Sequence, residues 1–267
     1  MLASSNAGRR PLVIARGAIA KPVREFGGLF AMSLDTLVQL VRPPFAWREF
    51  LHQSWFVARV SAVPAIGLAI PFNVLVVFIL NVLLFEIGAA DLSGTGAALA
   101  VITQTGPGTT VLTVGGAAAT AMCADLGART IREEIDAMKV MGINPIQRLA
   151  VPRVAALIVN AFLLNAIVCI VGLGGCYVFA VFVQHVTPGA FMASLTLLIG
   201  TRDVVICFIK AVIFGMVAGL IACYKGFTAG GGPQGVANAV NETVVYSFVA
   251  LFVINTLATA LSAKGVA

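Results

Sequence analysis

Residues 154–183 read VAALIVNAFLLNAIVCIVGLGGCYVFAVFV, an apolar run without a single charged side chain. No charge occurs anywhere between Val154 and Thr201. A helix needs about 20 mainly apolar residues to cross the hydrocarbon core of a membrane. The run therefore predicts a transmembrane helix.

The same bias extends over the whole chain of 267 residues, which is 60% hydrophobic and 10% charged, with a mean hydropathy of +1.01. A typical soluble domain is about 45–50% apolar and about 25% charged. A soluble protein of this size could not bury so much apolar surface, and transmembrane β-barrels have modest mean hydropathy because polar and apolar residues alternate in them. The composition therefore excludes a soluble enzyme and predicts an all-α integral membrane protein.

Five segments satisfy the length and hydropathy of a membrane span: Ala62–Phe85, Ala97–Cys123, Val154–Val183, Val204–Tyr224 and Val244–Leu261. Prolines within the first two predict kinks near Pro71 and Pro107. The second span is rich in Gly, Ala and Thr, and such small residues let helices approach closely in lipid. We expect it to be central in the bundle or to line the path of a substrate.

Lysine and arginine residues predict the orientation of the spans. Residues 1–59 contain eight of them, residues 125–153 contain five, and the link Glu86–Asp91 contains none. Because basic residues favour the cytoplasmic side, the N-terminus is expected inside and, after five spans, the C-terminus outside. The net charge of +6 is attributed to anionic lipid headgroups and not to nucleic acid. Lys210 lies within the fourth span, where it either snorkels outward or faces a wet cavity.

The first 60 residues form a separate predicted region, a cytoplasmic N-terminus with interfacial helices, and residues 61–267 form the transmembrane domain. Residues 27–60 are too charged to span a membrane, but their aromatic and basic residues alternate, which favours the headgroup level. We expect one or two amphipathic helices here, broken at Pro43-Pro44. A buried, soluble-style helix pair is the alternative.

The charged stretch DLGARTIREEIDAMKVMGINP, residues 125–145, predicts a short cytoplasmic helix at about 125–142. Thr130 is the expected N-cap, with Glu133 completing a capping box, and Gly142 ends the helix. One stripe of this helix is apolar and consists of Ile131, Ile135 and Met138. Such a helix is either a solvated connector or a docking surface for a soluble partner.

Residues 128–153, ARTIREEIDAMKVMGINPIQRLAVPR, resemble the signature of the MlaE/YrbE permeases, the membrane subunits of ABC transporters that work with MCE proteins. Residues 224–245, YKGFTAGGGPQGVANAVNETVV, are a second matching stretch. The resemblance extends from about Trp47 onward. The chain looks most like the actinobacterial YrbE proteins, including those of mycobacteria.

The resemblance implies a coupling helix that seats in a groove of a cytoplasmic ABC ATPase dimer. The ATPase-coupling residues would be Arg129, Arg132, Glu133, Glu134, Asp136 and Met138. Many family members have Glu-Gln where this chain has Glu133-Glu134, so the extra carboxylate can select a different ATPase. The other implied partners are a second, related YrbE-type permease and six MCE proteins.

The chain lacks the GxxxxGK[ST] phosphate loop, so it is expected to be a non-catalytic subunit without a cofactor of its own. ATP and Mg would bind to the partner ATPase. The glycines of residues 230–235 are interpreted as a flexible turn. His52 and His185 are isolated, and no metal site is expected.

The leading hypothesis is a multi-pass inner-membrane permease that moves phospholipid, fatty acid or sterol across or out of that membrane. Apolar spans suit a lipid tail, which needs no buried charge. By analogy with the family, the substrate path would include Leu80, Leu84, Ile102 and Gln104. The alternatives are a stand-alone channel or secondary transporter, which usually carries intramembrane charges, and a structural anchor for MCE proteins.

Overall fold

The computed structural model of the chain describes residues 10–42, 45–89 and 92–264, which form helices and connecting turns without a β-strand. The α-helices are α1 (Arg10–Val41), α2 (Trp47–Glu86), α3 (Ser93–Ala100), α4 (Gly106–Thr113), α5 (Ala119–Ile131), α6 (Glu134–Val140), α7 (Val151–Phe182), α8 (Pro188–Ser194), α9 (Thr201–Phe227) and α10 (Gly232–Lys264). Three π-helical turns continue them, η2 (Val101–Thr105), η3 (Val114–Ala118) and η4 (Ile146–Ala150).

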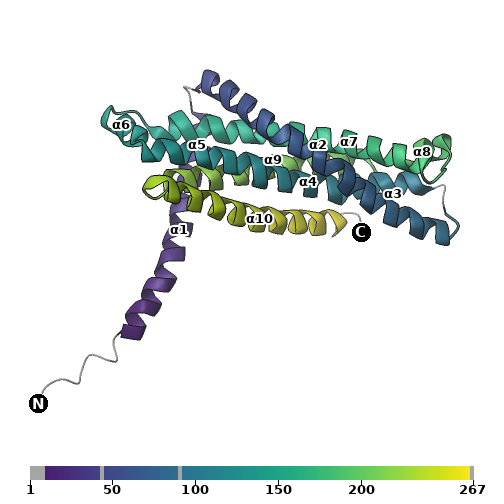
Figure 1. Cartoon of the computed structure of the whole chain (residues 1–267), viewed down its shortest axis with the longest axis horizontal. Coiled ribbons are helices and arrows are strands. Elements are labelled where there is room, and N and C mark those ends of the chain that lie inside the picture. The colour runs from purple at the N-terminus through teal and green to yellow at the C-terminus, as the bar shows by residue number, and fades with distance from the viewer. Residues whose placement is uncertain (1–9, 43–44, 90–91, 265–267) are drawn as a thin grey trace, which may run out of the picture.

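Within the described residues, five helical segments are long and apolar enough to cross a membrane, which confirms the all-α fold with five spans. They are Trp47–Glu86, Ser93–Ile131, Ile146–Phe182, Thr201–Phe227 and Gly232–Ser262. Successive spans run in opposite directions, so that α2 begins and α10 ends at opposite ends of the bundle (Figure 1). The sides of the membrane on which these ends lie stay predictions.

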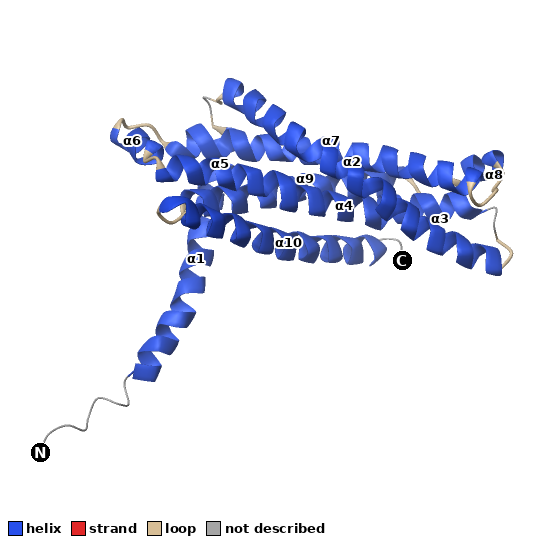
Figure 2. Ribbon diagram, viewed as in Figure 1, coloured by secondary structure: helices blue, strands red, loops and turns tan. Residues whose placement is uncertain are grey.

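The spans form one bundle in which α7 packs between α2 and α9, and α5 packs against α9 and α10 (Figures 1 and 2). Its largest core cluster draws buried side chains from all five spans, including Val57, Met122, Leu157, Phe214 and Leu251. Because no hydrophobic driving force brings helices together within a lipid bilayer, close packing must stabilise the bundle. At Gly215 of α9, an added Cβ would lie 2.6 Å from the carbonyl oxygen of Leu157 in α7, so the two helices can approach this closely here only because position 215 lacks a side chain.

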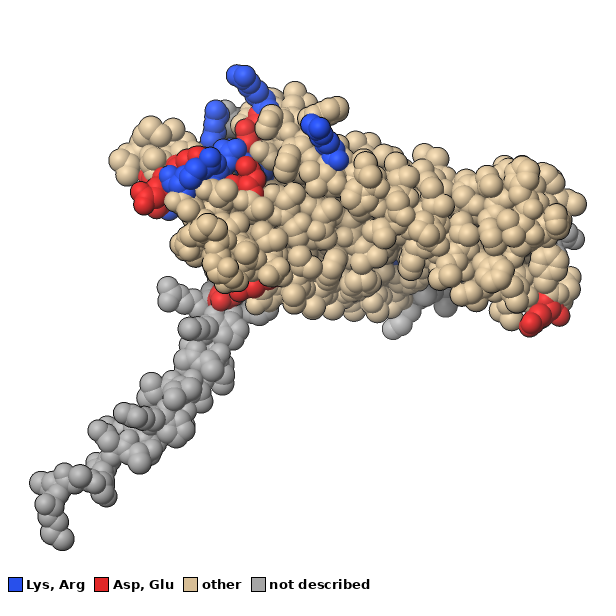
Figure 3. Space-filling view, in the orientation of Figure 1, with Lys and Arg blue, Asp and Glu red and all other residues tan. Residues whose placement is uncertain are grey.

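Charged side chains gather at the end of the bundle where α6 lies, and most of the length of the visible face has none (Figure 3). We call this the charged end; it comprises the start of α2, the turn between α5 and α6, and η4. Helix α1 crosses it and contacts α7, α9 and η4. The opposite end comprises the end of α2 together with α3 and α8 (Figure 1). The bundle therefore has the charge distribution expected of a membrane protein.

Of the one or two helices predicted before the first span, α1 is a separate helix, whereas the second is continuous with the span as part of α2. Helix α2 is continuous over 40 residues and passes without a break through residue 60, where the boundary between the two regions was placed, and through Pro64 and Pro71. At 1.5 Å per residue it is about 60 Å long, about twice the hydrocarbon thickness. Trp47 and Trp55 are exposed on its first turns, so the aromatic entry is the extension of the span itself. The predicted break at Pro43-Pro44 lies outside the described residues.

The second span is the most buried of the five, in agreement with its expected central position. It runs through α3, η2, α4, η3 and α5 and contacts α2, α7, α9 and α10. The π-helical turn η2 ends two residues before Pro107, the residue near which a kink is predicted. A proline lacks the N–H that would continue the α-helical ladder, and a π-turn is one way to accommodate that loss.

Polar residues within the spans bond to neighbouring helices. Asn160 of α7 donates to Ser54 Oγ of α2 over 2.7 Å. Lys210 of α9 is 4% exposed, and its Nζ donates to Thr259 Oγ1 of α10 over 2.8 Å. The snorkelling interpretation of Lys210 is therefore wrong, because its ammonium group points into the bundle.

Candidate functional site

The connection between α5 and α6 contains the predicted coupling residues, but its local structure differs from the prediction. Helix α5 continues through Thr130, whose Oγ1 donates to the carbonyl oxygens of Leu126 and Gly226 at 2.9 Å each. Thr130 therefore does not cap a helix, and the predicted capping box does not form. Its hydroxyl instead ties α5 to α9.

Helix α6 begins after Glu133, which has a left-handed backbone with φ of 59°. Few residues other than glycine adopt this conformation, so the chain turns sharply between α5 and α6. The predicted single helix at 125–142 is therefore the end of α5 followed by the short helix α6. The predicted stop at Gly142 is confirmed, because its φ is 75°. The N–H of Gly142 donates to the carbonyl oxygen of Lys139, and the N–H of Ile143 donates to that of Met138, as in a Schellman cap.

The structure brings the predicted coupling residues together on one protrusion at the charged end. Arg132 Nε lies 3.1 Å from Glu134 Oε1, and Lys139 Nζ lies 2.8 Å from Asp136 Oδ1. Glu133 is exposed and pairs with none of the described residues. Met138 is half-buried, packed against the core.

Two neighbours of these residues were missed by the sequence analysis. Val140 is 89% exposed and Met141 is 66% exposed, whereas Ile135 on the same protrusion is buried in the main core. The protrusion is therefore anchored by one apolar residue and presents two others outward. The signal in the sequence is the apolar pair Val140-Met141 directly before Gly142, which lies outside the apolar stripe of the predicted helix.

A second missed feature is an ion-pair network beneath the protrusion. Arg153 of α7 is fully buried, and its Nη2 lies 2.5 Å from Asp125 Oδ2 of α5 and 3.5 Å from Glu49 Oε1 of α2. Asp125 also pairs with Arg129 Nε at 3.4 Å, and Arg129 Nη1 reaches Glu134 of α6 at 4.0 Å. One continuous set of charges therefore joins α6 to α5, α7 and α2. Through it α6 is linked by ion pairs to three of the five spans.

A cavity of about 380 Å³ lies beside this network. Its lining is mostly polar and basic: Ala46, Trp47, Arg48, Glu49, His52, Arg129 and Arg148. The described residues contain no group of three His, Cys, Asp or Glu side chains that could hold a metal ion.

The predicted substrate-path residues lie on two neighbouring elements, away from the charged end. Leu80 and Leu84 are half-buried on α2, close to its end at Glu86. Ile102 is half-buried and Gln104 is exposed on η2, which contacts α2. The structure groups the helices that carry these residues, and their role as a lipid path stays a prediction.

Comparison with known proteins agrees with this arrangement. The sequence model of the family described as Permease MlaE matches residues 50–261. The chain belongs to the MlaE permease family. The match begins near the start of α2 and ends near the end of α10, so it includes all five spans and the α5–α6 protrusion.

Two of the three relatives described next are named as probable ABC transporter permeases. A probable ABC transporter permease protein of Rickettsia typhi is 27% identical over 89% of this chain and 92% of its own length. A similar protein of Synechocystis is 29% identical over 63% of this chain and 64% of its own. The chloroplastic protein of Arabidopsis thaliana named trigalactosyldiacylglycerol 1 is 30% identical over 58% of this chain and 45% of its own. The permease is thus a multi-pass membrane subunit of an ABC transporter, and its family implies a partner ATPase.

Proposed function

We propose that this permease moves lipids across or out of the inner membrane as part of an MCE-type ABC transporter, driven by a separate ATPase dimer that binds ATP and Mg. The proposal extends to a second, related permease and six MCE proteins as partners. The observation that carries it is the α5–α6 protrusion, with an outward apolar tip and an ion-pair network that leads inward.

The protrusion has the features of a docking element. Val140 and Met141 offer apolar surface that an ATPase groove would bury, while Glu133, Asp136 and Lys139 provide a charged rim. Interfaces commonly combine an apolar anchor with such a rim. For ATP to drive a conformational change, the two states of the ATPase must bind α6 differently.

The ion-pair network supplies a route from α6 to the spans. A displacement of α6 acts on Glu134 and Arg129, then on Asp125, and from there on Arg153. Arg153 lies in the long helix α7, and Glu49 lies at the start of α2. Because α2 extends to Leu80 and Leu84, movement at the charged end can reach the proposed lipid path.

A lipid substrate agrees with the chemistry of the spans. Several of their polar groups bond to one another, as Asn160 does with Ser54 and Lys210 with Thr259. Ion-coupled transporters, by contrast, bind or relay the coupling ion through charged side chains within the membrane. The name of the Arabidopsis relative, which is that of a glycolipid, also favours lipid transport.

The test is to purify the intact complex from membranes, assay its ATP turnover and identify bound lipids by mass spectrometry. We expect an ATPase to copurify, its activity to depend on the permease, and lipid to be bound. Purification of the permease alone would favour a channel, and MCE proteins without altered ATP turnover would favour an anchor. Either result would overturn the proposal.

A further inference from the structure

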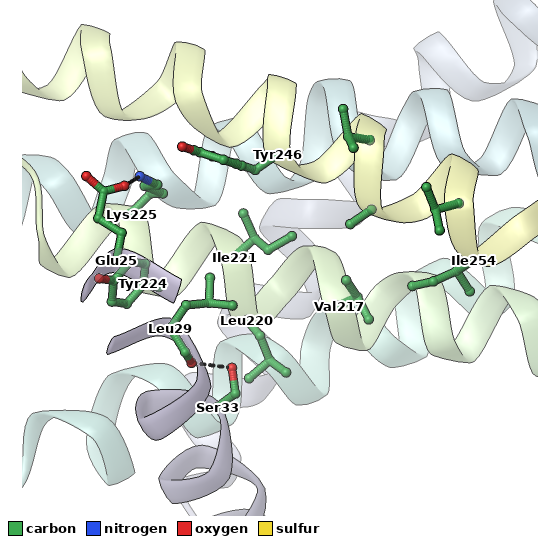
Figure 4. A pocket seen from close by; sticks show the side chains of 13 residues that line it. Glu25, Leu29, Ser33, Val217, Leu220, Ile221, Tyr224, Lys225, Tyr246 and Ile254 are labelled. Atoms are coloured by element: carbon green, nitrogen blue, oxygen red, sulfur yellow. Dashed lines mark hydrogen bonds and ion pairs between the residues drawn. The ribbon is translucent and has the colours of Figure 1, made fainter. Parts of the chain in front are cut away.

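Two adjoining cavities lie at the junction of α1, α9 and α10, close to the charged end. The larger has a volume of about 480 Å³ and the smaller about 260 Å³. They share Glu25 of α1 and both Tyr224 and Lys225 of α9. Figure 4 shows Glu25, Lys225 and Tyr246 grouped at one end of the larger cavity, with Val217 and Ile254 farther along it.

The larger cavity is an apolar slot beyond this polar entrance. Its walls are Leu29 of α1, Val217, Leu220 and Ile221 of α9, and Val249, Ala250, Val253 and Ile254 of α10. Along α10 the slot extends from Tyr246 to Ile254, which at 1.5 Å per residue is about 12 Å. An apolar slot of this shape fits part of an acyl chain.

The smaller cavity is a polar chamber with an excess of negative charge. Its lining includes one cation and two carboxylates, and Lys225 Nζ lies 2.9 Å from Glu25 Oε2 and 2.6 Å from Glu242 Oε2. Lys225 is also 4.5 Å from the centre of the Tyr246 ring. The lysine is thus already surrounded by partners, whereas both carboxylate side chains are about half exposed, at 50% and 53%. The chamber is therefore suited to a cation and poorly suited to a free anion.

We propose that these two cavities together bind one membrane phospholipid whose headgroup carries an ammonium group, as in phosphatidylethanolamine or phosphatidylcholine. The ammonium group lies against Glu25 and Glu242, where the rings of Tyr224 and Tyr246 can also attract it. One acyl chain occupies the slot between α9 and α10. The site is distinct from the proposed lipid path, because Leu80 and Leu84 lie toward the opposite end of α2.

The occupant is a lipid and not a second copy of the chain, because the polar and apolar parts are divided as in one amphiphile. A second copy facing this site through the same surface would bring two chambers of like charge together, which is unfavourable. Zwitterionic headgroups meet no such repulsion. The site also ties α1 to α9 and α10, so its occupancy would affect how α1 lies on the bundle.

The test is lipid binding to the full-length permease in detergent without ATP, measured by native mass spectrometry. The probes are phosphatidylethanolamine, phosphatidylcholine and phosphatidylglycerol with identical acyl chains. The net negative charge of the chamber and the rings of Tyr224 and Tyr246 attract both headgroups, including the choline group, which has no N–H to donate. The two ammonium lipids should therefore bind about tenfold more tightly than phosphatidylglycerol, which is about 1.4 kcal/mol. Equal or tighter binding of phosphatidylglycerol would overturn the proposal, whatever the outcome of the transport assay.

Two variants locate the site. Glu242→Gln leaves Lys225 paired with Glu25 and should remove most of the preference for ammonium lipids, whereas Glu86→Gln at the opposite end should leave it unchanged. Ala250→Trp fills the slot and should weaken binding of all three lipids, while the unfolding temperature shows that the fold is intact. Unchanged lipid binding in Ala250→Trp, with an altered oligomeric state by light scattering, would assign the groove to a second copy instead.

Discussion

Arg153 Nη2 of α7 lies 2.5 Å from Asp125 Oδ2 of α5, and this pair forms the inner end of the charge network beneath α6. The arginine is fully buried, whereas the aspartate side chain is 31% exposed. Arg153 Nε has no hydrogen-bond partner among the described residues. The two members of the pair therefore differ in what their loss would leave behind.

We predict that Asp125→Ala destabilises the permease more than Arg153→Met does. The first leaves a buried guanidinium with Glu49 as a distant ionic partner and the carbonyl oxygen of Leu149 as a hydrogen-bond acceptor. Removal of one partner from a buried ion pair costs about 3–5 kcal/mol. The second leaves a half-exposed carboxylate that still pairs with Arg129 and replaces the arginine by an apolar side chain of similar length. Thermal unfolding in detergent measures the difference. A larger loss for Arg153→Met would refute the prediction.

The turn at Glu133 gives a prediction in which backbone and charge can be separated. Glu133→Lys should abolish ATP-driven lipid transport while the complex stays in the membrane, because the residue is exposed on the proposed ATPase face. Glu133→Val should also impair transport, since a left-handed backbone costs an ordinary residue about 1–2 kcal/mol and more for a β-branched side chain. Glu133→Gly removes the charge but suits a φ of 59°. Transport assays in proteoliposomes compare the three variants.

If Glu133→Gly transports normally and Glu133→Lys does not, the added positive charge is what disrupts the contact. Normal transport by Glu133→Lys would refute the assignment of this residue to the coupling surface.

The five spans could be predicted because each is an apolar run between charged segments in the local sequence. The end of α6 before Gly142 could be predicted because glycine is a common helix stop. The turn at Glu133 could not, because glutamate is not a residue that signals a left-handed backbone, and the apolar stripe from Ile131 to Met138 continues across the turn. The predicted capping box does not form because Thr130 lies within α5, where its hydroxyl donates to the carbonyl oxygen of Gly226 in α9. This tertiary contact is not visible in the local sequence. The pairing of Arg153 with Asp125 depends on how the bundle places the start of α7 beside α5, which no local pattern contains.

Lys210 gives a prediction about a buried charge within a span. Its Nζ has Thr259 as its hydrogen-bond partner, although an ammonium group has three hydrogens to donate. Replacement of a poorly compensated buried charge by an apolar residue is often neutral or stabilising by about 1–4 kcal/mol, so Lys210→Met should unfold at an equal or higher temperature. Thr259→Val, which removes the acceptor and keeps the lysine, should be destabilised by about 1–3 kcal/mol. A loss of lipid transport in Lys210→Met with normal stability would instead show that the lysine has a role in transport.

The exposed tip of the protrusion gives the most direct test of the docking surface. Met141→Asp places a charge where an ATPase groove would bury an apolar side chain, and it should not unfold the permease because Met141 is 66% exposed. A residue at the centre of an interface contributes about 2 kcal/mol or more, which is about a thirtyfold loss of affinity. Met192→Asp is the matched control, since Met192 is 55% exposed on α8 at the opposite end. Copurification of the ATPase with each variant, together with ATP turnover, measures the effect. Equal loss in both variants would mean that the charge acts on the membrane complex as a whole, and undiminished binding in Met141→Asp would place the ATPase contact elsewhere on the charged end.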